Sequence, residues 1–249
     1  MRILLLFERI IKFIKTFNLS KNTFGSIFNS TYSINSTEVA IGITHYCSDI
    51  ETIIDVGANK GQFAVAIKKA FPNAHIYCFE PIESEFEKLS KNLAKFTNVT
   101  LFNIALGETV SSAEFNLNQY SLSSSFLNVT EEHTDEKPIT AQWRKVEIEI
   151  STLNKLVSND DVRIQGKTLL KIDVQGFEEK VLRGSDKVLN LVDLIVLECS
   201  FIPLYENELL FQEMHELLGS YGFFLRAPLS FWQRRNLKII QTDLLYERK

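Results

Sequence analysis

Two acidic residues end neighbouring apolar runs in the stretch "TIIDVGANKGQFAVAIKKAFPNAHIYCFEP" (52–81). Asp55 is followed by a turn that contains Gly57 and Gly61, and Glu80 ends the next apolar run. Glycines in such a turn let the backbone approach a ligand closely. An acid at the end of the following strand can accept both hydroxyl groups of a ribose. These residues therefore predict a site for a nucleotide-like ligand.

The turn itself narrows the choice of ligand. Gly61 is followed by Gln62 and Phe63, so the Lys-Ser/Thr pair of a triphosphate-binding loop is absent, and the spacing also differs from G-x-G-x-x-G. We expect Asp55 to direct its negative charge into the ligand site. This charge would repel a pyrophosphate but suits the ammonium and sulfonium groups of S-adenosylmethionine. Taken singly, Asp55 can instead be a turn or cap aspartate, and Glu80 an exposed acid.

A second acidic pair ends two later strands. Asp173 follows "TLLKI" and Glu198 lies near the end of "VDLIVLEC", so both are expected at the carboxyl edge where open α/β sheets bind ligands. A hydroxyl group becomes a good nucleophile only when its proton is removed or a metal polarises it. Asp173 is our candidate base or substrate orienter. Alternatively, Asp173 and Glu198 hold Mg²⁺ or Mn²⁺, or Asp173 only caps the next helix and Glu198 only pairs with a basic neighbour.

Alternating strands and helices are needed to bring these residues together. Apolar runs and helical periodicity predict strands at 52–56, 75–79, 99–103, 168–174, 192–199, 222–226 and 237–248, and helices at 61–71, 83–96, 178–184 and 207–219. This alternation predicts parallel strands joined by helical crossovers. Between 107 and 168 the rhythm changes to an antiparallel pair, 112–117 and 145–150. A serine-rich loop (120–128) and a polar loop (131–137) with a solvated His133 lie between its strands.

Composition sets the broad class of protein. The chain has 249 residues, 45% of them apolar, which suits one α/β domain at 51–249 with an N-terminal helical extension at 1–50. A net charge of −4 argues against nucleic acid as a partner. Three scattered cysteines are typical of a reduced, cytoplasmic protein. Residues 1–17 are predicted to form a basic amphipathic helix. We expect this helix to pack on the domain or on a second copy, with peripheral membrane association as the alternative.

Several segments match one family in order and spacing. "DVGANKGQFA", "FEP", "NIALG", "LLKIDVQGFEEKVLRG" and "IVLECSFIPLYEN" resemble the FkbM-type methyltransferases over roughly residues 51–226. The resemblance implies an α/β, Rossmann-like class I methyltransferase fold. Its mostly parallel seven-stranded sheet has one antiparallel strand and helices on both faces, and the final pair of strands forms the reversed hairpin.

The resemblance also implies S-adenosylmethionine as the cofactor and particular roles for residues. One group surrounds its methionine end: Asp55, Gly57, Asn59, Gly61 and Phe63. Glu80 takes the ribose. The neighbours expected around the adenine are Pro81, Ile82, Asn103 and Ala105. The serines of "SLSSS", including Ser124 and Ser125, are expected to close over the cofactor.

The family is generally associated with O-methylation of hydroxyl groups on sugars and natural products, so a small-molecule or carbohydrate acceptor is expected. Two other functions compete: a nicotinamide-dependent oxidoreductase on a related fold, and a scaffold that keeps the fold without catalysis. The missing G-x-G-x-x-G speaks against the first, and the intact acidic residues against the second. The sequence leaves the acceptor and the oligomeric state, including a homodimer, open.

Overall fold

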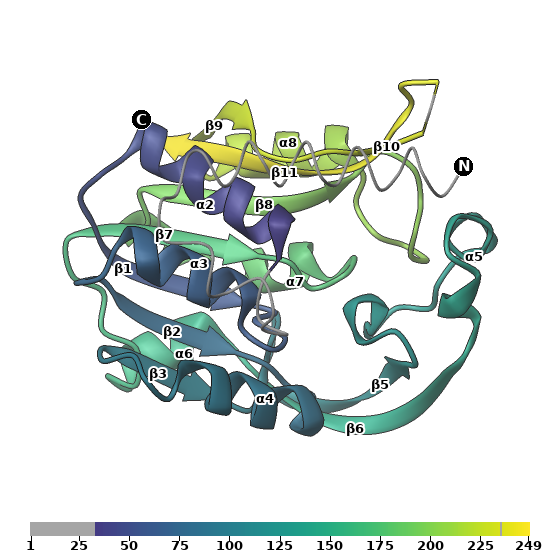
Figure 1. The fold of residues 1–249 in the computed structure, drawn as a ribbon, viewed down its shortest axis with the longest axis horizontal. Coiled ribbons are helices and arrows are strands. Elements are labelled where there is room, and N and C mark those ends of the chain that lie inside the picture. The colour runs from purple at the N-terminus through teal and green to yellow at the C-terminus, as the bar shows by residue number, and fades with distance from the viewer. Residues whose placement is uncertain (1–32, 235) are drawn as a thin grey trace.

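The computed structural model describes residues 33–234 and 236–249, so the predicted helix at 1–17 lies outside it. Within these residues the main element is an eight-stranded sheet in the order β10-β11-β8-β7-β1-β2-β3, with β9 also paired to β11 (Figure 1). Its strands are β1 Ile50–Val56, β2 His75–Phe79, β3 Val99–Phe102, β7 Lys167–Ile172, β8 Leu194–Ser200, β9 Phe223–Pro228, β10 Trp232–Gln233 and β11 Ile239–Arg248.

The strand directions confirm the predicted sheet. β3, β2, β1, β7 and β8 are parallel, and β11 runs antiparallel to β8. Because β9 is antiparallel to β11, it runs in the same direction as the first five strands. Of the seven predicted strands, six therefore share one direction and one is reversed, as expected. The two-residue β10, which also pairs with β11, was not predicted.

Helices cover both faces of this sheet (Figure 1). One face packs against α2 Ile34–Tyr46, α3 Gln62–Ala70 and α4 Glu83–Leu93. The other packs against α6 Leu153–Ser158, α7 Glu178–Arg183 and α8 Phe211–Ser220, with the short η4 Leu189–Leu191 nearby. Successive strand residues point to opposite faces, so Ile53 joins the first core and Ile54 the second. Burial on both faces explains the nearly continuous apolar runs of the strands.

A smaller three-stranded sheet interrupts the alternation. It contains β4 Ala105–Leu106, β6 Trp143–Ser151 and β5 Ser111–Asn118 in that order, and its β5–β6 pair confirms the predicted antiparallel strands. We call residues 119–142, between β5 and β6, the insertion. It contains η2 Ser121–Ser123, α5 Glu131–Glu136 and η3 Pro138–Ala141.

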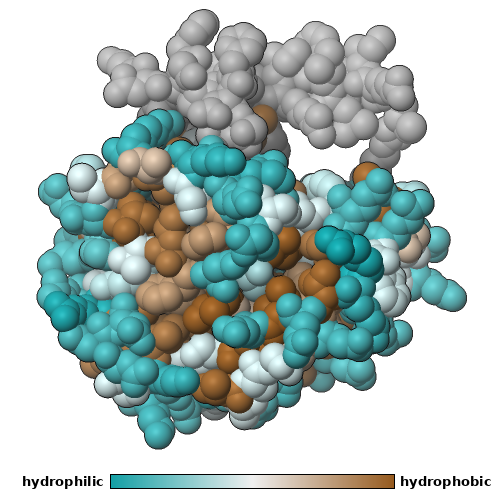
Figure 2. Space-filling view, turned by 90° about the horizontal axis from the view of Figure 1, so that it is seen from below, coloured by the Kyte–Doolittle hydropathy of each residue, from teal (hydrophilic) through white to brown (hydrophobic). Residues whose placement is uncertain are grey.

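The side of the molecule seen in Figure 2 groups hydrophobic side chains across its middle and hydrophilic ones around its border.

The polar loop predicted at 131–137 is instead largely helical. The Thr130 side chain accepts a hydrogen bond from the backbone N–H of His133 and so caps α5. His133 was expected to be solvated, but it is buried, with its ring edge-on to Tyr205 and its Nδ1 3.2 Å from the carbonyl oxygen of Leu204. Burial lowers the pKa of His133 to about 4, and Lys137 acts in the same direction. The prediction of a solvated His133 was therefore wrong.

The second half of the proposed N-terminal extension is helical and packed. Val39, Ala40 and Ile43 of α2 are buried in the same core as the apolar side chains of α3. The domain boundary at residue 50 stays a prediction. In the part of the chain that the structure describes, every helix is too short or too polar to cross a bilayer.

If α2 belongs to the cooperative fold, truncating its core side chain must destabilise the whole domain. Ile43→Ala removes a side chain with 0% exposure and should lower the free energy of unfolding by about 2–5 kcal/mol. The matched control is Ile139→Ala, at a residue that is 52% exposed, and it should change stability by under about 0.5 kcal/mol. Urea denaturation measures both. Equal effects of the two substitutions would contradict the packing described here.

Candidate active site

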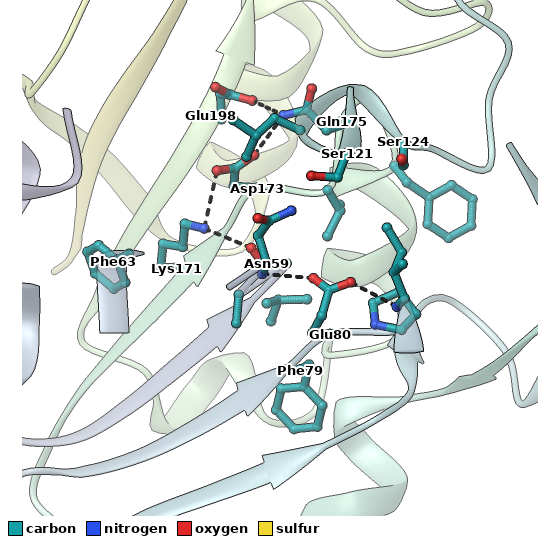
Figure 3. A pocket seen from close by; sticks show the side chains of 18 of the residues that line it. Asn59, Phe63, Phe79, Glu80, Ser121, Ser124, Lys171, Asp173, Gln175 and Glu198 are labelled. Carbon is teal, nitrogen blue, oxygen red and sulfur yellow. Dashed lines mark hydrogen bonds and ion pairs between the residues drawn. The ribbon is translucent and has the colours of Figure 1, made fainter. Parts of the chain in front are cut away.

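A pocket of about 530 Å³ opens where the central strands of the large sheet end. The turns after β1, β2 and β7 and the end of β8 contribute side chains to it, and the insertion contributes others (Figure 3). Carboxyl ends of parallel strands are where open α/β sheets bind their ligands. The site predicted from sequence therefore coincides with this pocket.

The turn after β1 requires glycine at its first position. Gly57 has a φ of +79°, and a Cβ atom there would lie 1.9 Å from the carbonyl oxygen of Asp173. Two strand ends therefore approach each other as closely as backbone allows. Asn59, in the same turn, also has a positive φ, and its Oδ1 is buried without a hydrogen-bond partner among the described residues. An unpaired buried acceptor on a pocket wall suits a ligand that brings a hydrogen-bond donor.

Glu80 links this turn to the segment after β2. Its Oε2 accepts a hydrogen bond from the backbone N–H of Asn59, and its Oε1 accepts one from that of Ile82, each at 2.8 Å. The side chain is only 3% exposed. Burial raises the pKa of Glu80 to about 7, although the two N–H donors act in the opposite direction. Each oxygen keeps a second lone pair, so hydrogen bonds to ribose hydroxyls remain compatible with this geometry.

Beneath the pocket a buried ammonium joins two carboxylates. Asp55 and Lys171 are direct partners in the β1–β7 register. Lys171 Nζ lies 3.3 Å from Asp55 Oδ1. It also lies 3.2 Å from Asp173 Oδ2 and 5.6 Å from the ring centre of Phe63 (Figure 3). Burial lowers the pKa of Lys171, but the carboxyl groups, Asp173 first, raise it far above its usual range. Lys171 is therefore protonated.

Because of this ion pair, the charge of Asp55 does not point where the sequence suggested. The sequence led us to expect its charge in the ligand site, but its side chain is 0% exposed, does not line the pocket, and faces Lys171. Burial raises the pKa of Asp55, and Lys171 acts against that shift. Asp55 thus acts on the pocket through Lys171. The difference arises because the partner of Asp55 lies on the neighbouring strand β7, far from the turn in sequence.

Asp173 and Glu198 lie on either side of an amide. Gln175 Nε2 donates to Asp173 Oδ1 at 2.8 Å and to Glu198 Oε2 at 2.6 Å (Figure 3). The Tyr205 hydroxyl donates to Gln175 Oε1 at 2.8 Å. Burial acts to raise the pKa of Asp173, but Lys171 and these hydrogen bonds hold it below its usual value. Burial and the charge of Asp173 raise the pKa of Glu198 well above normal. The ionised form is therefore favoured for Asp173 and the protonated form for Glu198.

The Asp173–Glu198 pair does not fit the expected Mg²⁺ or Mn²⁺. Both carboxyl groups already accept hydrogen bonds from Gln175, and the ammonium of Lys171 occupies the place beside Asp173 where a cation would bind. Among the described residues, no group of three or more His, Cys, Asp or Glu side chains is arranged to hold a metal ion. Divalent cations of this kind usually need a larger set of free oxygen ligands.

Most of the residues predicted from sequence are brought together here. Those that line the pocket are Gly57, Asn59, Phe63, Glu80, Pro81, Ile82, Ala105, Ser124, Asp173 and Glu198. Asn103, Gly61 and Ser125 lie behind the wall, as Asp55 does. Asn103 donates to the backbone carbonyls of Glu80 and Pro81, and Ser125 donates to that of Gln175. Their roles toward a cofactor stay predictions.

Other residues of the site were missed in the sequence. Lys171, Gln175, Asp243 and Lys137 all line the pocket. A signal existed for two of them, because a lysine in "TLLKIDV" and an aspartate in "TDLLYER" interrupt strands that are otherwise apolar, and charged side chains are seldom fully buried unless paired. Gln175 and Lys137 lie in irregular segments, where pattern alone gives no such signal.

The open α/β sheet, its reversed strand beside β8 and the pocket at the strand ends define a class I methyltransferase fold. A family model of the methyltransferase FkbM domain matches residues 55–225, and the chain belongs to this family.

Three individual relatives share 25% or 28% sequence identity with this chain over the matched residues. The 2-O-methyltransferase NoeI of Sinorhizobium fredii is 25% identical over 185 residues, which are 71% of this chain and 74% of that protein. The methyltransferase sdnD of Sordaria araneosa is 28% identical over 219 residues, 76% of this chain and 82% of that one. The hexuronic acid methyltransferase AglP of Haloferax volcanii is 28% identical over 153 residues, 59% and 55% of the two chains.

The buried ammonium should matter for folding. Lys171→Met leaves buried carboxylates without their cation, so the free energy of unfolding should fall by about 3–5 kcal/mol. Asp55→Asn/Lys171→Met removes one carboxylate as well, and its loss should be smaller than the sum of the two single losses. Urea denaturation of the four proteins in this cycle measures the coupling. Strictly additive losses would show that the Asp55–Lys171 pair is not an energetic unit.

Glu80 should make stability depend on pH. Its folded-state pKa of about 7 lies above the ordinary 4.5, so the folded protein holds the proton more tightly and the stability that it contributes is lost as pH rises from 4.5 to 7. This loss amounts to roughly 3 kcal/mol at about 1.4 kcal/mol per pH unit. Glu80→Gln should therefore lose less stability than wild type between pH 5 and pH 8.

The measurement is urea denaturation at both pH values. Glu87→Gln, which removes an exposed carboxylate of α4, is the matched control and should follow wild type. A Glu80→Gln profile parallel to that of wild type would contradict the assignment of the proton to Glu80.

Proposed function

We propose that the protein transfers a methyl group from S-adenosylmethionine to a hydroxyl group of a sugar, a glycan or a small natural product. The observation that carries this proposal is the ionised carboxylate of Asp173, 31% exposed, at the pocket wall directly beside the Gly57 turn. A proton acceptor at that place is what an alcohol acceptor needs and what a sulfonium donor tolerates.

The cofactor end of the pocket would lie between the turns after β1 and β2. Glu80 would accept the ribose hydroxyls. The adenine would lie against Pro81, Ile82 and Ala105. The unpaired Oδ1 of Asn59 would accept a hydrogen bond from the ligand. The fit rests on these described groups, and it agrees with the family to which the chain belongs.

The chemistry at the acceptor end of the pocket follows from the charges of Lys171 and Asp173. When bound, S-adenosylmethionine supplies a methyl group activated by its sulfonium. Asp173 would orient the acceptor hydroxyl and accept its proton as the new C–O bond forms and the C–S bond breaks, so that the positive charge on sulfur is lost. Lys171 keeps Asp173 ionised, and Gln175 holds its carboxylate in place. Positioning supplies much of the rate in such a displacement.

The name of one relative supports a hydroxyl acceptor, because NoeI is a 2-O-methyltransferase. The name of a second supports a carbohydrate acceptor, because AglP is a hexuronic acid methyltransferase. A nicotinamide-dependent oxidoreductase or a non-catalytic scaffold has no comparable support. We also propose that the protein acts in the cytoplasm on small-molecule or carbohydrate acceptors and not on nucleic acid. A membrane surface or a second copy would be the partner of residues 1–17.

Two substitutions should separate cofactor binding from catalysis. Wild type should bind S-adenosylhomocysteine saturably in calorimetry, and Glu80→Ala should weaken this binding about tenfold or more, because buried hydrogen bonds to the ribose are lost. Asp173→Asn should still bind, but its kcat for methylation of a sugar acceptor should fall about 10²–10⁴-fold. Asp161→Asn, at an exposed aspartate, is the control.

Failure of folded wild type to bind S-adenosylhomocysteine would overturn the proposed function. Full activity of Asp173→Asn would leave the function standing but remove Asp173 as the proton acceptor.

A further inference from the structure

Lys137 of the insertion brings a second cation to the pocket. It directly follows α5 and lines the cavity. Its Nζ lies 3.9 Å from the ring centre of Trp232 in β10 and 5.6 Å from that of Tyr120. An ammonium held against an indole face is positioned rather than left to sample solvent. Lys137 is thus a fixed positive charge in the pocket wall.

The charge of Lys137 is not neutralised by the described residues. Lys171, the other cation of the described lining, is paired with Asp55 and Asp173, but Lys137 Nζ has neither an ion pair nor a hydrogen bond in residues 33–234 and 236–249. Of the nearby acids, Asp173 is paired with Lys171 and Glu198 accepts a hydrogen bond from Gln175. Burial lowers the pKa of Lys137, while Glu198 and Asp173 act to raise it. A partly dehydrated ammonium of this kind favours an anionic ligand.

The neighbouring basic residue does not serve the same purpose. Arg234 is bound to Glu132 and Glu136 of α5, at 3.3 and 2.5 Å, and so joins the insertion to the segment after β10. These ion pairs, together with the contact between Lys137 and Trp232, tie α5 and Lys137 to β10 and the residue that follows it. The position of Lys137 is therefore fixed by the ion pairs of α5, which precedes it, and by its own contact with Trp232.

This position lies away from the proposed cofactor end. Trp232 belongs to β10 and Glu80 follows β2, and these strands are five positions apart in the sheet. At about 4.8 Å between neighbouring strands, the separation is roughly 24 Å. The electrostatic partners of Lys137 are Glu198 and Asp173, the two acids of the acceptor end. Lys137 therefore faces the acceptor, and the carboxylate of the cofactor is not its natural partner.

We infer that the acceptor is an acidic sugar, whose carboxylate pairs with Lys137 while one of its hydroxyl groups meets Asp173. This inference rests on the proposed function and names its substrate class. One ammonium matches the single charge of a carboxylate. A phosphate carries close to two charges near neutral pH, and among the described lining residues no arginine accompanies Lys137 to bind it in a bidentate manner.

Binding of three sugar probes to the complex with S-adenosylhomocysteine tests this inference. The probes are methyl glucuronide, the neutral methyl glucoside and glucose 6-phosphate, followed by saturation-transfer NMR and calorimetry. Wild type should bind the glucuronide about tenfold or more tightly than the glucoside. Lys137→Met should remove this preference, and Lys137→Arg should keep part of it. Lys145→Met, at an exposed lysine of β6 that is paired with Glu114, is the matched control and should behave as wild type.

Each other outcome has a distinct meaning. Equal binding of glucuronide and glucoside, no sugar binding by a protein that still binds S-adenosylhomocysteine, or a preference that survives Lys137→Met would overturn the inference and leave the proposed function intact. Tighter binding of glucose 6-phosphate would overturn the choice of a carboxylate. Loss of S-adenosylhomocysteine binding in Lys137→Met would instead assign Lys137 to the cofactor. If wild type binds no S-adenosylhomocysteine, the proposed function fails first.

Discussion

The ammonium of Lys171 is the interaction on which the pocket depends. It lies on β7 between a carboxylate from β1 and one at the end of its own strand, so it ties together the two strands whose turns form the pocket floor. A buried charge is tolerable only when it is paired. The pairing with Asp55 therefore constrains the register of β1 and β7, and the pairing with Asp173 constrains where that carboxylate points.

The same ammonium influences which of the neighbouring carboxyl groups carries a proton. With Lys171 charged, Asp173 stays ionised, and the charge of Asp173 then favours the protonated form of Glu198 across the amide of Gln175. Two carboxyl groups that occupy one wall thus have pKa values shifted in opposite directions, because only one of them is paired with the cation. Environments that separate the pKa values of neighbouring acids are typical of catalytic sites. Here a single side chain, placed below the pocket, produces the separation.

Sequence reasoning recovered what local patterns encode. The strand and helix rhythm, the reversed strand, the antiparallel pair and the pocket-lining residues at the strand ends all follow from periodicity or from family motifs. The Asp55–Lys171 pair escaped because it depends on which strands are neighbours, and these residues are far apart in the chain. The burial of His133 escaped because it depends on Tyr205, also distant in sequence. Long-range partners, rather than local propensities, account for what was missed.

The division of the pocket between segments has a consequence for how such proteins diversify. The proposed cofactor end is built by the turns after β1 and β2 and by β4, whereas Tyr120, Leu122 and Lys137 at the proposed acceptor end all come from the insertion. One continuous segment of the gene can therefore change without altering the other half of the pocket. The hydrogen bond from Ser125 to the carbonyl of Gln175 and the ion pairs of Arg234 with α5 are among the attachments that hold this segment in place. Replacement of the insertion alone would then change the choice of acceptor and leave the proposed cofactor end of the pocket unchanged.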